Sequence, residues 1–480
     1  MTAEEPNNNQ IITFGCRLNA FESEAIKKAV EESGEKNLIV FNSCAVTAEA
    51  EKDLRVKIKQ EKQKNPTAKI IITGCASQID PQKYAKMPEV DLIIGNADKS
   101  KVESYNLQNK FTKNSTENFV KNHDTKNINS NSSPDFSYPE SFHADQKFLQ
   151  QKNSQNIFLK PEEHSKIKVN DIMSVRDTSP QLVSYFENQT RAFLEIQNGC
   201  NHRCTFCIIP YGRGNSRSVP LGEIVEQSQK MTNSGHREIV LTGVDISDYG
   251  KDLPSPLTLS QMIRRLLKMV PALDRLRLSS VDVAEIDEEF FEILANEPRL
   301  MPYLHLSVQS GDDMILKRMK RRHKRSQIIK FCQTARSIRP DMTFGADIIA
   351  GFPTEDDKMF NNSLSLIKEA DLIFTHIFPY SARAGTPASK MPQLDKKIIK
   401  ERAKILREAG LNQLNQYLDQ QINKNFAVLI EKNNRGKSPN FLDIEIIDEN
   451  FCGQQNEVYN CKIIGKKLDK NKPVLMAKIL

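Results

Sequence analysis

The chain of 480 residues contains no tryptophan and no apolar run long enough to cross a bilayer. Its first ten residues are polar and acidic, without the basic and apolar segments of a secretory signal. These absences argue against a membrane protein and against a secreted one. We therefore expect a cytoplasmic protein with no membrane partner, whereas the absence of tryptophan excludes no function.

Hydrophobic residues are also scarce, at 38% of the chain, which is low for a globular protein. Much of this deficit falls in residues 101–187, which are rich in Asn, Lys, Ser and Gln and show little periodicity. Such a stretch cannot bury enough apolar surface to order itself, so we expect a flexible linker or insertion there. The net charge of +7 permits an anionic partner such as RNA without requiring one.

Three of the nine cysteines form the motif C-x3-C-x2-C, as Cys200, Cys204 and Cys207. Three thiolates can hold three corners of a cuboidal iron–sulfur cluster and leave its fourth iron open to S-adenosylmethionine. The alternatives are a zinc site completed by His202 or a distant residue, and cysteines that merely pack in a core. No fourth cysteine follows at zinc-finger spacing, which favours the cluster.

A second set of three cysteines lies in residues 8–100, where short apolar runs alternate with charged helical stretches in the rhythm of a parallel sheet. Cys16, Cys44 and Cys75 each follow a predicted strand and are about 30 residues apart, the length of one β-α unit. Open α/β sheets bind ligands at the carboxyl ends of their strands, so we expect a second three-thiolate site. The alternative is simple packing of small apolar side chains. Glu22, on the first helix, is expected on a solvated face.

Residues 188–422 contain six strand candidates separated by amphipathic helices, which predicts a partial (β/α)6 barrel. Function in such barrels lies at the carboxyl ends of the strands. We assign four residues of these strands and strand ends as candidate cofactor contacts, and we assign no catalytic acid, base or nucleophile. The four residues are Gly243, Asp245, Gln309 and Asp347.

Two further regions suggest contact with nucleic acid. The basic run from Lys317 to Arg325 could hold phosphates or could be the solvated end of a helix. Residues 423–480 read as short strands with interspersed lysines, and small all-β modules of this size often close into barrels that bind nucleic acid.

Taken together, these segments resemble the methylthiotransferases of the radical S-adenosylmethionine superfamily. The resemblance rests on the three cysteine blocks of the N-terminal region, on the radical motif and on a C-terminal module similar to the RNA-binding TRAM domain. The matching residues are 13–19, 42–47, 73–76, 199–214 and 423–480. The implied fold is α/β, with an open N-terminal parallel sheet, a central partial (β/α)6 barrel and a small C-terminal all-β barrel.

The resemblance also implies cofactors and partners. Cys200, Cys204 and Cys207 would hold a [4Fe-4S] cluster that cleaves S-adenosylmethionine to a 5′-deoxyadenosyl radical. Cys16, Cys44 and Cys75 would hold an auxiliary [4Fe-4S] cluster involved in delivering sulfur, and a second S-adenosylmethionine would supply the methyl group. The partners implied are tRNA, contacted at its anticodon loop, and an electron donor such as flavodoxin or ferredoxin.

Within this family, residues 211–217 and 241–245 are most similar to the branch that adds a methylthio group to C2 of N6-threonylcarbamoyladenosine beside the tRNA anticodon. A base in a single-stranded loop can be presented to a protein pocket. The alternatives are the branches acting on N6-isopentenyladenosine or on a ribosomal-protein aspartate. Outside the family, the alternative is a non-catalytic RNA-binding protein whose cysteines hold zinc.

Overall fold

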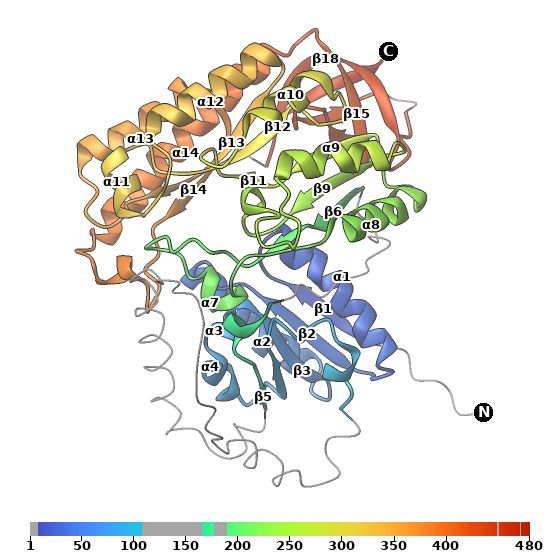
Figure 1. Ribbon diagram of the computed structural model, residues 1–480, viewed down its shortest axis with the longest axis vertical. Coiled ribbons are helices and arrows are strands. Elements are labelled where there is room, and N and C mark those ends of the chain that lie inside the picture. The colour runs from blue at the N-terminus through green and yellow to red at the C-terminus, as the bar shows by residue number, and fades with distance from the viewer. Residues whose placement is uncertain (1–7, 108–165, 177–189, 449–450, 471) are drawn as a thin grey trace, which may run out of the picture.

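The computed structural model describes residues 8–107, 166–176, 190–448, 451–470 and 472–480 (Figure 1). An open parallel sheet is followed by a curved parallel sheet with helices on its outside and then by a closed antiparallel-rich barrel. The expected α/β class is therefore confirmed. Most of the predicted linker lies outside the described residues.

The N-terminal sheet has the strand order β1-β2-β3-β4-β5, with every pair parallel. The strands β2 and β3 are buried almost throughout, as expected for a sheet that helices cover on both faces. The elements are β1 (Gln10–Thr13), α1 (Arg17–Glu32), β2 (Leu38–Ser43), α2 (Ala48–Lys64), β3 (Lys69–Gly74), α3 (Cys75–Ile79), α4 (Pro81–Ala85), β4 (Leu92–Ile94), η1 (Val102–Ser104) and β5 (Ile167–Lys168).

The strand β5 comes from the stretch that the sequence predicted to be a linker. Ile167 pairs with Ile93 of β4, and the turn η3 (Ile172–Ser174) follows. On the other side of the gap, Tyr105 and Leu107 are buried in the N-terminal core. The linker prediction is therefore wrong at both ends of the stretch, because so few residues produce no period in the sequence.

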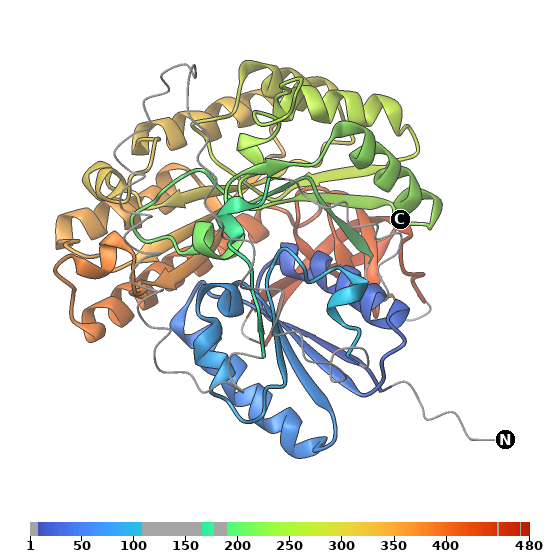
Figure 2. The ribbon, with the colours of Figure 1, turned by 60° about the horizontal axis from the view of Figure 1, so that its bottom comes forward.

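The central unit is an arch of six parallel strands (Figure 2). The order β6-β9-β10 continues into β11-β12-β13-β14, because β10 runs into β11 across Ser279. The predicted partial barrel is thus present. The elements are β6 (Arg191–Glu195), β7 (Gln197–Asn198), α7 (Ile209–Arg213), β8 (Arg217–Ser218), α8 (Leu221–Asn233), β9 (Glu238–Thr242), η4 (Ile246–Asp248), α9 (Leu259–Met269), β10 (Arg275–Leu278), β11 (Ser280–Val281), α10 (Glu288–Asn296), β12 (Tyr303–Gln309), α11 (Asp313–Arg318), α12 (Arg325–Ile338), β13 (Thr343–Ala350), α13 (Asp357–Glu369), β14 (Leu372–Pro379), η5 (Pro387–Lys390) and α14 (Lys396–Asp419).

The C-terminal unit is a closed barrel with the order β15-β16-β17-β19-β18. Four of its strands were expected, and β16 was not, because its sequence Arg-Gly-Lys has no apolar residue. The elements are β15 (Asn425–Lys432), β16 (Arg435–Lys437), β17 (Asp443–Ile446), β18 (Val458–Asp469) and β19 (Lys472–Ile479).

The three units pack against one another through apolar and polar contacts. On α1, Phe21 and Ala25 join the core of the arch, while Ile26 packs with the N-terminal sheet. At the base of the arch, Phe441 of the C-terminal barrel stacks on Tyr303 at a ring separation of 4.5 Å. The C-terminal barrel therefore closes the amino-terminal end of the arch. The helix α1 packs on both the arch and the N-terminal sheet.

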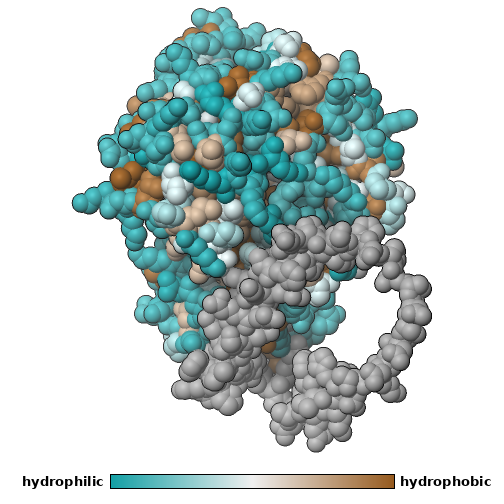
Figure 3. Space-filling model, turned by 60° about the vertical axis from the view of Figure 1, so that its left-hand side comes forward, coloured by the Kyte–Doolittle hydropathy of each residue, from teal (hydrophilic) through white to brown (hydrophobic). Residues whose placement is uncertain are grey.

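The surface is mainly hydrophilic on the face shown in Figure 3, where apolar side chains are scattered. No helix among the described residues has both the length and the apolar character needed to cross a bilayer.

Candidate active site

The three N-terminal cysteines lie at one edge of the sheet, as the sequence predicts. Cys16 precedes α1, Cys44 follows β2, and Cys75 is the first residue of α3. Residue pairs at the ends of neighbouring strands, such as Ser43 with Gly74, are in register. The parallel ladder therefore brings the three thiols to one place.

Two glycines make this edge possible. Gly15 and Gly74 both have positive φ, at 124° and 96°. A Cβ on Gly15 would lie 3.0 Å from the Cβ of Cys44, and one on Gly74 would lie 2.4 Å from the backbone of Ser43. Any side chain at either position would displace a neighbour of the cysteines.

The N-terminal thiols interact electrostatically with one another, and two of them accept hydrogen bonds. Burial, with the neighbouring Cys75 and Cys16, raises the pKa of Cys44 to about 11. The backbone N–H of Val46 donates to Cys44 Sγ at 3.5 Å, and Asn96 Nδ2 approaches Cys75 Sγ at 3.8 Å. The raised pKa keeps the free Cys44 thiol protonated at neutral pH, so a metal that binds this thiol would release its proton.

Cys200, Cys204 and Cys207 lie in the loop between β7 and α7. The N–H of Cys207 donates to the carbonyl of Cys204 at 3.0 Å, which keeps the second half of the motif tightly turned. Thr205 holds the loop to the end of α11 by donating its N–H to Met319 O at 3.1 Å. Burial and the neighbouring Cys204 raise the pKa of Cys207 to about 12.

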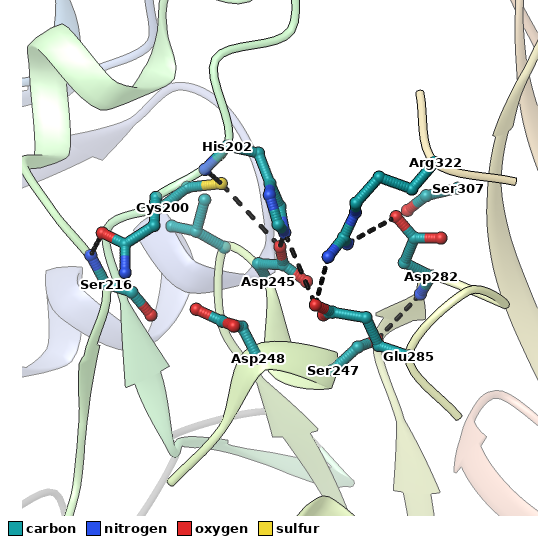
Figure 4. A network of polar contacts seen from close by, with 12 residues as sticks. Cys200, His202, Ser216, Asp245, Ser247, Asp248, Asp282, Glu285, Ser307 and Arg322 are labelled. Atoms are coloured by element: carbon teal, nitrogen blue, oxygen red, sulfur yellow. Dashed lines mark hydrogen bonds and ion pairs between the residues drawn. The ribbon is translucent and has the colours of Figure 1, made fainter. Parts of the chain in front are cut away.

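A network of charged side chains surrounds this loop (Figure 4). His202 contacts Asp245 at 2.9 Å, and Asp245 Oδ2 lies 3.8 Å from Cys200 Sγ. Glu285 lies 3.9 Å from His202 and pairs with Arg322. His202 is thus engaged with carboxylates, and the proposed alternative in which it completes a zinc site is not favoured.

Two arginines of the basic run from Lys317 to Arg325 form contacts with other parts of the protein. Arg321 donates to Cys204 Sγ at 3.6 Å and to Asp282 at 2.9 Å. Arg325 pairs with Glu369 at 2.6 Å. Although burial alone would raise it, His323 and Arg321 hold the pKa of Asp282 below its usual range. Arg321 therefore acts within the protein, whereas the Arg325–Glu369 pair lies at the exposed start of α12, as the interpretation of a solvated helix end predicts.

The four candidate cofactor contacts separate into two groups. Gly243 has no room for a Cβ, which would lie 2.7 Å from Gln197 O, and Asp245 lies beside Cys200. Gln309 ends β12 with a left-handed φ of 68°. Asp347 lies within β13 and contacts His305 and His376, at 2.9 and 3.3 Å. Asp347 thus lies inside a strand, whereas Gly243 and Asp245 follow the end of β9.

A buried ion-pair network, missed by the sequence analysis, connects the two cysteine sets. Arg213 follows the radical motif and donates to both oxygens of Glu22, at 2.8 and 3.0 Å. Lys99 contacts the same carboxylate at 2.6 Å, and Glu22 is only 1% exposed. The expected solvated position of Glu22 is wrong, because its partner comes from a segment 191 residues away.

The same network affects the pKa values of two acids. Although burial would raise it, Arg213 and Lys99 lower the pKa of Glu22 to about 2. Glu195, at the end of β6, has no such direct partner, and burial together with the charge of Glu22 raises its pKa to about 7. The Asn198 amide donates to Glu195 at 2.7 Å and accepts from Arg213 at 3.1 Å. Asn198 therefore links Glu195 to Arg213, the partner of Glu22.

The distances between possible ligand atoms bear on the choice between an iron–sulfur cluster and a single zinc ion. Four ligands around one zinc at about 2.3 Å bring their sulfur atoms within about 4 Å of one another. Among the described residues, the two groups whose possible ligand atoms all lie within 4.8 Å contain no cysteine. They are His305 with Asp347 and His376, and His202 with Asp245 and Glu285. Neither cysteine set therefore belongs to such a close group among the described residues, and the C-x3-C-x2-C spacing of Cys200, Cys204 and Cys207 favours an iron–sulfur cluster at that set.

Comparisons with known proteins agree with this site. Residues 194–367 match the Radical SAM superfamily, and residues 8–95 match the family described as "Uncharacterized protein family UPF0004". The "Threonylcarbamoyladenosine tRNA methylthiotransferase MtaB" of Rickettsia prowazekii is 47% identical, over 95% of this chain and 94% of that protein. The "tRNA-2-methylthio-N(6)-dimethylallyladenosine synthase" of Neorickettsia sennetsu is 28% identical, over 90% and 86%.

A solved structure shares the fold. The radical S-adenosylmethionine methyltransferase TsrM of Kitasatospora setae has a TM-score of 0.51 and 14% identity, and the match covers 79% of this chain and 73% of that one. The match to the Radical SAM superfamily implies a [4Fe-4S] cluster and S-adenosylmethionine as cofactors, and the motif Cys200, Cys204 and Cys207 fits that cluster. The chain is an enzyme and belongs to the radical S-adenosylmethionine methylthiotransferase family.

Proposed function

We propose that this enzyme installs a methylthio group at C2 of N6-threonylcarbamoyladenosine beside the anticodon of tRNA. The 47% identity to the Rickettsia prowazekii protein over nearly the whole chain carries this choice of substrate. The relative named for dimethylallyladenosine is 28% identical. Neither relative is named for a ribosomal-protein substrate, so we do not favour that target.

The proposed roles follow from the two cysteine sets. Cys200, Cys204 and Cys207 hold the cluster that, when bound, supplies the electron for radical cleavage of S-adenosylmethionine. The other set, Cys16, Cys44 and Cys75, holds an auxiliary [4Fe-4S] cluster from which sulfur is delivered. Gly243, Asp245 and Gln309 are proposed to contact S-adenosylmethionine. An external donor such as flavodoxin or ferredoxin provides the electrons.

The Arg213–Glu22 ion pair supports the assignment of different roles to the two cysteine sets. Arg213 directly follows the radical motif, and Glu22 lies on α1, which begins next to Cys16. Because both side chains are almost fully buried, the two cysteine sets are held at a fixed separation. A substrate base bound between them is near both the radical source and the sulfur source, which converts two encounters into one binding event.

The C-terminal barrel provides a surface suited to RNA. Lys462 and Lys478 lie opposite each other on neighbouring strands, and both are exposed. Like charges directly opposite destabilise a sheet, so this pair favours an anionic partner. Phosphate contacts of this kind position RNA without reading its sequence.

The test is nucleoside mass spectrometry of tRNA from cells with and without the protein. We expect the methylthio form of threonylcarbamoyladenosine to disappear alone, and to return with the unchanged gene but not with a Cys204→Ala variant. Loss of methylthio from the isopentenyl nucleoside, or no change in any nucleoside, would refute the proposal.

A further inference from the structure

Arg17 is a cation that forms no ion pair with any of the residues that the structure describes. It is the first residue of α1, directly after Cys16, and its guanidinium lies 5.9 Å from the centre of the Phe441 ring. It is also within electrostatic range of Tyr303 and Asp347. The side chain therefore extends from the auxiliary cysteine edge towards the interior of the arch, below the strand ends.

The other cations around Phe441 all have carboxylate partners. Arg191 pairs with Glu431 at 2.8 Å. Arg277 pairs with Glu238 at 2.7 Å, and Lys437 pairs with Asp443 at 2.5 Å. No carboxylate or hydrogen-bond acceptor among the described residues reaches the Arg17 guanidinium in this way. The surroundings of Phe441 therefore neutralise three cations and leave the Arg17 guanidinium available.

The wall near Arg17 is accessible to a bound molecule. Asp347 is 27% exposed and His376 is 57% exposed, although both lie on strands of the arch and contact each other. His305 holds the far side of this group, with Tyr303 Oη 3.2 Å from its Nδ1. Solvent therefore reaches this part of the wall, on β13 and on the edge strand β14.

A half-buried guanidinium that lacks a partner is suited to bind an anion, because burial removes water without replacing its hydrogen bonds. The threonylcarbamoyl group ends in a carboxylate, whereas the isopentenyl group is entirely apolar. A base that enters the arch through the strand ends carries its N6 substituent with it, while the phosphates stay at the surface. The carboxylate is therefore the anion of the substrate that can reach Arg17.

We propose that Arg17 binds the carboxylate of the threonylcarbamoyl group and so determines the preference for this nucleoside over an uncharged one. This inference rests on the function proposed above. Arg17 is a specificity-determining residue, and its position next to Cys16 couples substrate recognition to the auxiliary cysteine edge.

The test measures RNA binding by the cluster-loaded enzyme under anaerobic conditions, without S-adenosylmethionine. The probes are anticodon stem-loops carrying threonylcarbamoyladenosine, its threonine carboxamide analogue or unmodified adenosine, followed by fluorescence anisotropy. The unchanged enzyme should bind the carboxylate RNA roughly tenfold to hundredfold more tightly than the carboxamide RNA, as for a charged hydrogen bond. Arg17→Gln should bring this ratio close to one, and Arg17→Lys should restore part of it.

The matched control is Arg191→Gln, which removes a cation near the same ring but one that Glu431 already neutralises. It should leave the carboxylate-to-carboxamide ratio unchanged, even if it weakens binding of every RNA. The inference is overturned if Arg17→Gln keeps the preference or if both variants lose it equally.

Turnover separates this inference from the proposed function. If the unchanged enzyme adds methylthio to an isopentenyladenosine stem-loop and not to the threonylcarbamoyl one, the proposed function fails. If it modifies the threonylcarbamoyl RNA but binds the carboxamide equally well, only the role of Arg17 fails.

Discussion

Glu195 is the buried acid whose protonation has the clearest consequence for stability. It is 4% exposed, and its Oε2 has no hydrogen-bond partner among the residues that the structure describes. Its pKa is raised to about 7 by burial and by the charge of Glu22. Between the usual value near 4.5 and about 7, the folded protein therefore holds one more proton than the unfolded chain.

The expected result is a free energy of unfolding that falls as pH rises through this window, by up to about 3 kcal/mol from this group. Glu195→Gln removes the titration, so the variant should lose less stability than the unchanged protein between pH 5 and pH 8. Urea unfolding under anaerobic conditions at several pH values measures this difference. As a control, the exposed Glu226→Gln should follow the unchanged protein, and parallel profiles for Glu195→Gln would contradict the assignment.

At the scale of elements, the junction from β3 to α3 sets the position of Cys75. Gly74 has a φ of 96°, and an added Cβ would lie 2.4 Å from the backbone N and O of Ser43. Backbone atoms of a neighbouring strand cannot move aside cheaply, so Gly74→Ala must shift either β2 or the start of α3.

We expect Gly74→Ala to lose the N-terminal metal site and keep the other. Iron analysis after anaerobic reconstitution should give about four irons per chain where the unchanged protein gives about eight, for two cubanes. Gly222→Ala is the matched control, because nothing lies within 4 Å of the Cβ it would add on α8. Full iron content in Gly74→Ala would show that this glycine is not needed for the site.

Most elements follow from local pattern, and the exceptions have physical causes. The alternation of six strands with helices in the arch was predicted, because apolar periodicity is local and strong there. The strands β5 and β16 were not, since one has two residues and the other is polar. Strands this short are fixed by their partners rather than by their own sequence.

The candidate site was predictable in its cysteines and not in its ion pairs. Spacing in the chain identifies both cysteine sets, because parallel strands and a short loop bring such residues together. The pairing of Glu22 with Arg213 joins residues 191 positions apart, and Arg321 approaches Cys204 from 117 positions away. Long-range partners of this kind leave no periodic signal, so a buried acid was read as a solvated one.

At the scale of the whole molecule, Phe441 is the residue through which the C-terminal barrel closes the base of the arch. It stacks on Tyr303, and Thr343 donates its hydroxyl to the neighbouring Asn440 O at 2.7 Å. Arg277 donates to Ser438 O at 2.9 Å in the same loop. The two units therefore share one continuous interface.

Phe441→Ala should weaken this interface, by less than the about 3 to 5 kcal/mol that removing a fully buried aromatic ring costs, because Phe441 is only partly buried. We expect limited proteolysis to release residues 423–480 much faster from the variant. Leu468→Ala, at a position 73% exposed on the same barrel, should be cleaved at the rate of the unchanged protein. Equal release rates for the two variants would mean that other contacts hold the units together.

The ion-pair network of Glu22, Lys99 and Arg213 joins residues that are synthesised at different times. Glu22 and Lys99 are translated long before Arg213, and the loop at Ser438 to Phe441 that closes the arch is translated later still. The N-terminal sheet therefore contains Glu22 and Lys99, which contact each other in the folded protein, before Arg213 is added to the chain. The buried network is therefore complete only once the chain extends beyond Arg213, which adds two hydrogen bonds to a carboxylate that Lys99 also contacts.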